Sequence, residues 1–271
     1  MNEDSLHLPA ASLPTLKLRA KLLGEIRRFF ESHGYFEVET PLLCRESVID
    51  AHLDPFVVEL SGLPSADQLL AYLQTSPEFC MKRLLAAGAE RIYQLCKAFR
   101  RDESGQLHNP EFTMLEWYAV GVDQLEQMDF IESLCRQILR DSNLIQELPA
   151  SFVRVSYEQA FQNSLAISPL ECTVEDLIQA AERTIPDDIP TNHKGEKEGK
   201  DFWCDLLLTG CIEDWLKEQR AVFVYDYPVS QAALARVSPT DPRVAERFEL
   251  FLDGIEISNG YRELLNAEEL E

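Results

Sequence analysis

The segment RFELFLDGIEISNGYREL, residues 247–264, has the alternating pattern of a β-hairpin and also carries three glutamates seven residues apart. Asp253-Gly254 is a strong two-residue turn signal between two stretches of alternating apolar residues. Carboxylates are normally depleted from strand pairs as apolar as this one. A hairpin closed at Asp253-Gly254 predicts three cross-strand pairs: Leu252 with Ile255, Phe251 with Glu256, and Leu250 with Ile257.

Side chains alternate along a strand, so the hairpin is expected to have two different faces. One face holds the apolar set Phe248, Leu250, Leu252, Ile255 and Ile257, and the other holds Glu249, Phe251, Glu256 and Ser258. Glu249 and Glu256 are then diagonal neighbours within reach of a common ligand. Two carboxylates together with water and phosphate oxygens suit Mg²⁺. The alternative is a solvated polar face with no ligand.

The third carboxylate, Glu263, does not follow the alternation. It lies an odd number of positions from Glu256, which puts it on the opposite face of a regular strand. An irregularity near Ser258-Asn259-Gly260 would restore it to the face of Glu256. Gly260 favours a bulge at this place.

The composition is that of an ordinary globular chain with a sizeable core, with 271 residues of which 45% are apolar and 27% charged. No run of about 18 apolar residues occurs, and the N-terminus is acidic and polar, which predicts neither a membrane span nor a signal peptide. Seven scattered cysteines without a C-x-x-C pair indicate reduced thiols in a cytoplasm. Five histidines without an H-x-x-x-H pattern argue against a zinc site.

The formal net charge of −22 disfavours extended binding to nucleic acid. A polyphosphate backbone needs a basic surface, which this chain lacks on average. One nucleotide held through Mg²⁺ and a few arginines is compatible with the charge.

Hydrophobic periodicity and capping signals predict a mixture of helices and strands. Hairpins among them favour an antiparallel sheet flanked by helices, which is an α+β fold. Residues 186–200 are predicted to form a solvated loop. The expected helices are 15–33, 76–87, 123–141, 156–164, 173–183 and 202–218, and the expected strands are 35–43, 91–100, 111–120 and 221–228.

A second cluster of functional side chains lies in FRRDESGQLHNPEFTMLEWY, residues 99–118. Arg100 ends one strand and can clamp a carboxylate or phosphate as a bidentate fork. The returning strand carries Glu116, which with Glu78 can hold an ammonium group. Taken alone, this segment is simply a charged hairpin loop. Combined with residues 247–264, it predicts a site for ATP, Mg²⁺ and a cationic amino acid.

Three segments resemble class II aminoacyl-tRNA synthetases of the lysyl type. HGYFEVETPLL, residues 33–43, resembles motif 1 with its proline at Pro41, and residues 72–118 resemble the motif 2 region. Residues 247–264 resemble the segment before motif 3. The likeness covers about residues 15–120 and 220–271. Residues 230–249, SQAALARVSPTDPRVAERFE, add to this likeness. The whole set of segments most resembles the free-standing, truncated lysyl-synthetase paralogues that modify translation elongation factor P.

This resemblance implies a two-step reaction in a cytoplasmic ligase. ATP and a lysine-like amino acid, preferably (R)-β-lysine, form an aminoacyl-adenylate with loss of pyrophosphate. The acyl group then passes to the ε-amino group of a lysine on elongation factor P. The family also implies Mg²⁺ and a homodimer, whereas the acidity of the chain argues against tRNA as a partner.

The resemblance also implies roles for individual residues. Arg100, Glu249 and Glu256 would be catalytic, with Glu249 and Glu256 on Mg²⁺ and Arg100 between the reacting carboxylate and the α-phosphate. Ser76, Glu78 and Glu116 would bind the amino group near that carboxylate. The substrate-binding set is completed by Tyr118 and Glu263 at the distal ammonium and by Asn259 and Tyr261 along the pocket. The expected ATP-binding set is Arg100, Asp102, Asn109, Phe112, Glu249 and Leu250.

Two departures from the family pattern lower the expected activity. Motif 2 has Asp102 where the family has glutamate, and the aspartate side chain is one methylene shorter. Glu103 is a candidate substitute. The sequence ends at NAEELE before any motif 3 region, and it has no anticodon-binding barrel, so a single catalytic domain over 1–271 is expected. The alternatives are a catalytically impaired binding or regulatory module, and a minimal lysine-activating enzyme that charges a small RNA.

Overall fold

The structure is a computed structural model that describes residues 10–47, 53–60, 69–105, 107–142, 148–187, 189–190 and 199–266. The chain divides into two compact units, residues 1–121 and 122–271, and each is described by itself. None of the described helices is long and apolar enough to cross a membrane. All seven cysteines are free thiols.

The first unit contains two three-stranded sheets, with strand orders β1-β5-β6 and β2-β4-β3. The pair β1–β5 is parallel and the other pairs are antiparallel. The elements of this unit are α1 (Leu13–Ser32), β1 (Phe36–Glu37), β2 (Leu43–Cys44), β3 (Val57–Leu60), β4 (Leu69–Leu73), α2 (Glu78–Ala86), β5 (Arg91–Phe99) and β6 (Glu111–Ala119).

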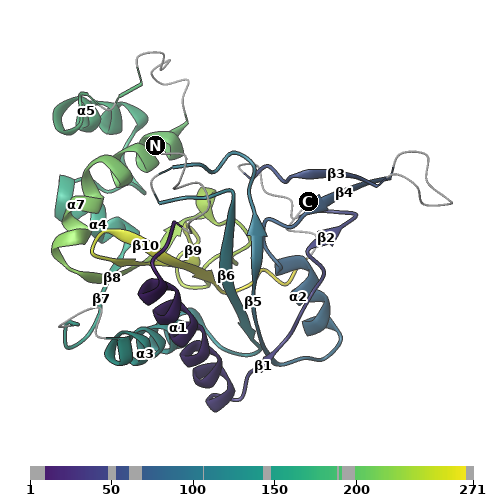
Figure 1. Cartoon of the computed structure of the whole chain (residues 1–271). Coiled ribbons are helices and arrows are strands. Elements are labelled where there is room, and N and C mark those ends of the chain that lie inside the picture. The colour runs from purple at the N-terminus through teal and green to yellow at the C-terminus, as the bar shows by residue number, and fades with distance from the viewer. Residues whose placement is uncertain are drawn as a thin grey trace, which may run out of the picture. The chain divides into compact units, whose positions relative to one another are not determined.

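Helix α1 covers the β5–β6 hairpin (Figure 1). Ser12 caps the helix with its side chain, and Phe30 near the other end is fully buried. The Phe30 ring stacks on Tyr93 of β5 with 4.6 Å between centroids, and it meets Trp117 of β6 edge-on at 5.5 Å. Phe30, which belongs to the amphipathic helix predicted over 15–33, therefore packs in the core of this unit against both strands of the hairpin.

Two predictions for this unit need correction. The strand expected over 35–43 is reduced to two-residue strands on either side of Pro41, because proline has no N–H and the amide of Thr40 donates to Gln94 Oε1 at 3.1 Å instead. Helix α2 begins at Glu78, later than its predicted start, and ends at Ala86. The strands predicted at 91–100 and 111–120 are confirmed as the antiparallel pair β5–β6.

The second unit is built on one four-stranded sheet of order β10-β9-β8-β7, in which only β7–β8 is parallel among the described strands. Its elements are α3 (Gln124–Ser142), β7 (Val153–Ser156), α4 (Tyr157–Leu165), α5 (Val174–Thr184), α6 (Lys200–Leu207), the π-helix η3 (Leu208–Ile212), α7 (Glu213–Glu218), β8 (Ala221–Pro228), the 3₁₀ helix η4 (Val229–Gln231), β9 (Val244–Leu252) and β10 (Ile255–Tyr261).

The core of the second unit lies where helices α4 to α7 pack on the sheet. Tyr157, Phe161 and Trp203 are fully buried there together with Val222 and Phe251 of the strands. Helix α3 contacts β9 and β10. Antiparallel pairing therefore prevails in both units with helices around it, as the α+β prediction required.

Local signals placed most of these helices correctly. Helices α4 and α5 have capping boxes at Ser156 and Thr173, and Asp123 caps α3 by accepting from the Glu126 amide at 2.9 Å. The single helix expected over 202–218 is divided by η3, in which a Cβ on Gly210 would lie 2.9 Å from Ile185 Cδ1. The loop predicted at 186–200 falls largely outside the described residues.

Candidate active site

The β9–β10 hairpin closes at the predicted turn. Asp253 and Gly254 both have positive φ, 48° and 81°, which is the conformation of a type I′ turn. The predicted pairs Leu252–Ile255 and Phe251–Glu256 are confirmed. The predicted pair Leu250–Ile257 is wrong, because the register shifts between Glu256 and Ser258 and places Ser258 opposite Leu250.

The shift has a steric cause at Gly260. This glycine lies opposite Phe248, and a Cβ there would be only 2.5 Å from the Phe248 Cζ atom. Phe248 is 1% exposed and cannot move away, so the register that places a glycine over its ring is favoured. Gly260 thus permits a close approach, while the extra residue of the predicted bulge is Ile257.

The bulge reverses the alternation of the second strand. Asn259 pairs with Glu249 and Tyr261 pairs with Arg247, so the two predicted substrate residues lie on the face of Glu249. Ser258 moves to the opposite face from the one predicted. Glu263, two residues further along, forms an isolated bridge with Ala235.

Glu249 is buried and held by two side chains that the sequence analysis missed. It is 7% exposed, and its Oε1 accepts from Arg247 Nη2 at 2.5 Å while its Oε2 accepts from the Tyr227 hydroxyl at 2.6 Å. The Arg247 guanidinium also lies over the Tyr227 ring, 4.5 Å from its centroid, and donates to the Gln231 carbonyl at 2.6 Å. A buried carboxylate needs such partners, because an unpaired charge away from water is costly.

The donor chemistry of Glu249 and Glu256 fits a metal ion that brings further ligands with it. Glu256 is exposed, and each oxygen of Glu249 keeps a lone pair beside the one that accepts from Arg247 or Tyr227. The described residues contain no group of three histidine, cysteine or carboxylate side chains that could hold a metal alone. Mg²⁺ commonly takes one or two carboxylates and completes its coordination with water and substrate phosphates.

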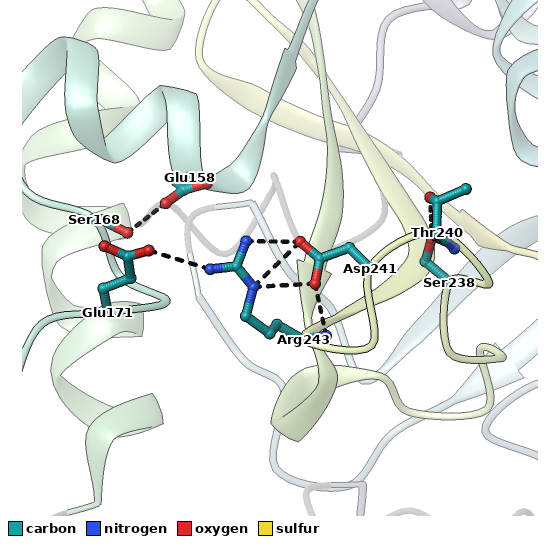
Figure 2. A network of polar contacts seen from close by, with 7 residues as sticks. All are labelled: Glu158, Ser168, Glu171, Ser238, Thr240, Asp241 and Arg243. Atoms are coloured by element: carbon teal, nitrogen blue, oxygen red, sulfur yellow. Dashed lines mark hydrogen bonds and ion pairs between the residues drawn. The ribbon is translucent and has the colours of Figure 1, made fainter.

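The segment between β8 and β9 lies beside this hairpin and takes part in a polar network (Figure 2). Arg243 donates to both oxygens of Asp241, at 3.0 and 2.7 Å, and reaches Glu171 beyond α4 at 3.3 Å. The guanidinium holds the pKa of Asp241 at about 2, below its usual value. The bridge from Ala235 to Glu263 leaves the same segment and is flanked by two backbone hydrogen bonds, from the Arg236 amide to the Arg262 carbonyl and from the Leu264 amide to the Leu234 carbonyl, both 2.9 Å long.

In the first unit, three of the predicted residues, Ser76, Glu78 and Tyr118, gather around a fourth, the half-buried carboxyl group of Glu116. Glu116 accepts from the Ser76 hydroxyl at 2.7 Å and from the Tyr118 hydroxyl at 2.7 Å. On the adjacent helix α2, Lys82 pairs with Glu78 at 2.6 Å. The pKa of Glu116 is raised to about 7, chiefly by burial and in smaller part by Glu78, although the hydrogen bonds from the two hydroxyls and the charge of Lys82 oppose the rise.

Arg100 lies at the end of β5 with partners on three sides. It donates to the Thr75 carbonyl at 3.4 Å and to Glu103 at 3.0 Å, and its guanidinium lies 5.1 Å from the centroid of the Phe112 ring. Glu103, the candidate substitute for Asp102 in motif 2, therefore contacts Arg100. Asp102 itself is exposed, and its Oδ2 lies 3.4 Å from Arg101 Nη2.

The two remaining residues of the predicted ATP-binding set differ in exposure. Asn109 is exposed in the loop before β6. Leu250 is fully buried on the face opposite Glu249, which leaves only its backbone for a ligand on the Glu249 face. Two of the residues that the sequence analysis missed could have been found from their spacing. Arg247 lies two positions from Glu249 on the same face of a strand, and Lys82 lies four positions from Glu78 on the same face of a helix. Tyr227 had no such signal.

Comparison with known proteins identifies the family. The model of the class II tRNA synthetases for D, K and N matches residues 8–271. The chain belongs to the class II tRNA synthetases. Proteins named elongation factor P–(R)-β-lysine ligase are similar to it over nearly its whole length. The one from Vibrio cholerae is 45% identical over 97% of this chain and 77% of the relative. Those from Vibrio atlanticus and Erwinia tasmaniensis are 43% and 42% identical, over 96% and 99% of this chain and 77% and 79% of the relatives.

Membership in the class II tRNA synthetases confirms the predicted fold and makes the chain an ATP-dependent ligase. Enzymes of this class use ATP and a divalent metal. The roles of the individual site residues stay predictions.

Proposed function

We propose that the chain activates (R)-β-lysine or lysine with ATP and transfers the acyl group to the ε-amino group of a lysine on elongation factor P. The names of the relatives that match 96–99% of the chain support this substrate and this acceptor. The observation that carries the proposal is the half-buried Glu116 with its two hydroxyl donors and the neighbouring Glu78, which is an environment suited to an ammonium group.

In the first step, an oxygen of the amino-acid carboxylate attacks the α-phosphorus of ATP, and pyrophosphate leaves with the electrons of the broken P–O bond. Glu116 and Glu78 bind the amino group, which fixes the neighbouring carboxylate in position. Arg100 holds the carboxylate and the α-phosphate together as a planar fork. Positioning removes the entropy cost of the encounter from the chemical step.

In the second step, the ε-amino nitrogen of the acceptor lysine attacks the acyl carbon, and AMP leaves through its phosphate oxygen. The amine gives up its proton to solvent. Mg²⁺, when bound, supplies positive charge to the phosphates, and Glu249 and Glu256 are the residues that would hold it. Arg247 and Tyr227 donate to Glu249 and fix the orientation of its carboxylate.

ATP–pyrophosphate exchange with (R)-β-lysine and with α-lysine tests the first step on the 271-residue chain. We expect exchange with at least one of the two, and a loss of about 100-fold or more in Glu116→Gln, since the ammonium then loses its counter-ion. Glu111→Gln on the same strand is the matched control, because Glu111 is exposed and pairs only with Lys97 among the contacts described.

The second step is tested by incubation with elongation factor P and measurement of its intact mass. Gain of one lysyl group, absent when the acceptor lysine is replaced, supports the proposal. A folded chain that gives neither exchange nor transfer refutes it and leaves a binding module.

Two statements about partners belong to the same proposal. The class implies pairing of two copies, which sedimentation of the purified chain would detect. The net charge of −22 makes tRNA an unfavourable partner, so aminoacylation of tRNA should stay at background.

A further inference from the structure

The charges around Glu116 do not balance when every group is ionised. Lys82 and Glu78 form an ion pair with N···O at 2.6 Å, with side chains 27% and 13% exposed. Their charges cancel, so an ionised Glu116 would add one uncompensated negative charge. In the part of the chain that the structure describes, the groups that face Glu116 are the Ser76 hydroxyl before α2, Glu78 and Lys82 on α2, Gln94 and Cys96 on β5, and Tyr118 on β6.

Among the described residues, none of the other groups that face Glu116 supplies the missing positive charge. Ser76 and Tyr118 donate hydrogen bonds but carry no charge, and Gln94 is an amide opposite Glu116 in the sheet. Burial raises the pKa of the Cys96 thiol to about 11, so this thiol stays neutral. The named groups therefore leave the cluster one positive charge short around the half-buried Glu116.

A proton supplies that charge in the ligand-free chain. The raised pKa of Glu116, about 7, means that the carboxyl is half protonated at neutral pH. With the proton in place the cluster is neutral. It is neutral again if Glu116 loses the proton and a substrate ammonium takes its position beside the carboxylate.

We propose that the amino group of the amino acid enters this cluster in exchange for one proton, and that Lys82 is a positioning residue that sets the charge balance for the exchange. This inference rests on the proposed function, since it concerns the same amino-acid site. The exchange is balanced: the carboxylic acid and the ammonium ion become a carboxylate–ammonium pair, and the proton goes to the buffer. The same number of protons is released if Glu116 keeps its proton and the amino group of the ligand gives one to the buffer instead.

Isothermal titration calorimetry of the full chain with lysine or (R)-β-lysine measures this proton directly. In buffers with different ionisation enthalpies, the slope of the observed heat gives the number of protons released per ligand. From the pKa of Glu116, we expect about 0.9 proton at pH 6, about 0.5 at pH 7 and about 0.1 at pH 8. 6-Aminohexanoate keeps the carboxylate and the distal ammonium but lacks the second amino group, so it should release no proton at this site.

Variants separate the exchange from a merely structural role. Glu116→Gln should abolish the pH-dependent release. Lys82→Met should shift the release curve upward by about one pH unit, because the carboxyl then loses a nearby positive charge. Lys82→Arg should restore the wild-type curve, and Lys97→Met, which breaks an exposed pair with Glu111, should not move it.

The outcomes distinguish this inference from the proposed function. Ligand binding whose heat is independent of the buffer at pH 6 and 7, together with ATP–pyrophosphate exchange, overturns the inference and leaves the function standing. Release that persists in Glu116→Gln also overturns it. A folded chain that binds neither amino acid and shows no exchange refutes the function and the inference together.

Discussion

Glu116→Gln is expected to make the chain more stable at alkaline pH, relative to wild type, although it should damage the amino-acid site. The pKa of Glu116 is raised from 4.5 to about 7. One pH unit corresponds to about 1.4 kcal/mol, so ionising this carboxyl in the folded chain costs about 3 kcal/mol. The stability that the protonated form contributes is fully present below pH 4.5 and is lost as the pH rises to about 7.

Glutamine cannot ionise, so it avoids this loss while keeping the size of the side chain and an oxygen that accepts from Ser76 or Tyr118. Urea unfolding of the two proteins at pH 5, 6, 7 and 8 measures the effect. We expect the difference in unfolding free energy to move in favour of Glu116→Gln by about 2.5 kcal/mol across this range, because part of the loss already occurs below pH 5. The same comparison for Glu111→Gln should be flat, because that carboxylate is exposed and paired with Lys97.

A difference between Glu116→Gln and wild type that varies by less than about 0.5 kcal/mol from pH 5 to 8 would refute the reasoning. It would mean that Glu116 titrates as in the unfolded chain. The charge balance proposed for the cluster would then lose its support as well.

Three further predictions concern the second unit and the metal. Gly260→Ala should destabilise the chain by about 1–3 kcal/mol because its Cβ would overlap the buried Phe248 ring, whereas Gly105→Ala, with open space around it, should be nearly neutral in urea unfolding. Arg247→Met should cost about 3 kcal/mol by leaving Glu249 buried without its cation, and adding Glu249→Gln should recover most of this in a double-mutant cycle; additive losses would contradict the pairing. Chelation with EDTA should abolish ATP–pyrophosphate exchange and Mg²⁺ should restore it, and exchange that survives chelation would exclude a required metal.

Short-range signals in the sequence predicted much of both units. The helices at 15–33 and 123–141 follow from amphipathic spacing and side-chain caps. The type I′ turn follows from Asp253-Gly254 alone, because these residues tolerate the positive φ that the turn requires. In each case the cause lies within a few residues of the element, which is why the sequence reveals it.

Contacts between distant residues decided the rest. The bulge at Ile257 follows from the close approach of Gly260 to Phe248 across the hairpin, which alternation cannot reveal. The position of Glu249 depends on Tyr227, 22 residues earlier, and the proton affinity of Glu116 depends on how deeply packing buries it.

The sequence by itself determined the family, the main elements and the shared strand face of Glu249 and Glu256, because these depend on motif and periodicity. Only the tertiary structure decided which of these carboxylates is buried and what neutralises it. Burial and pairing depend on atoms that become neighbours only when the chain has folded.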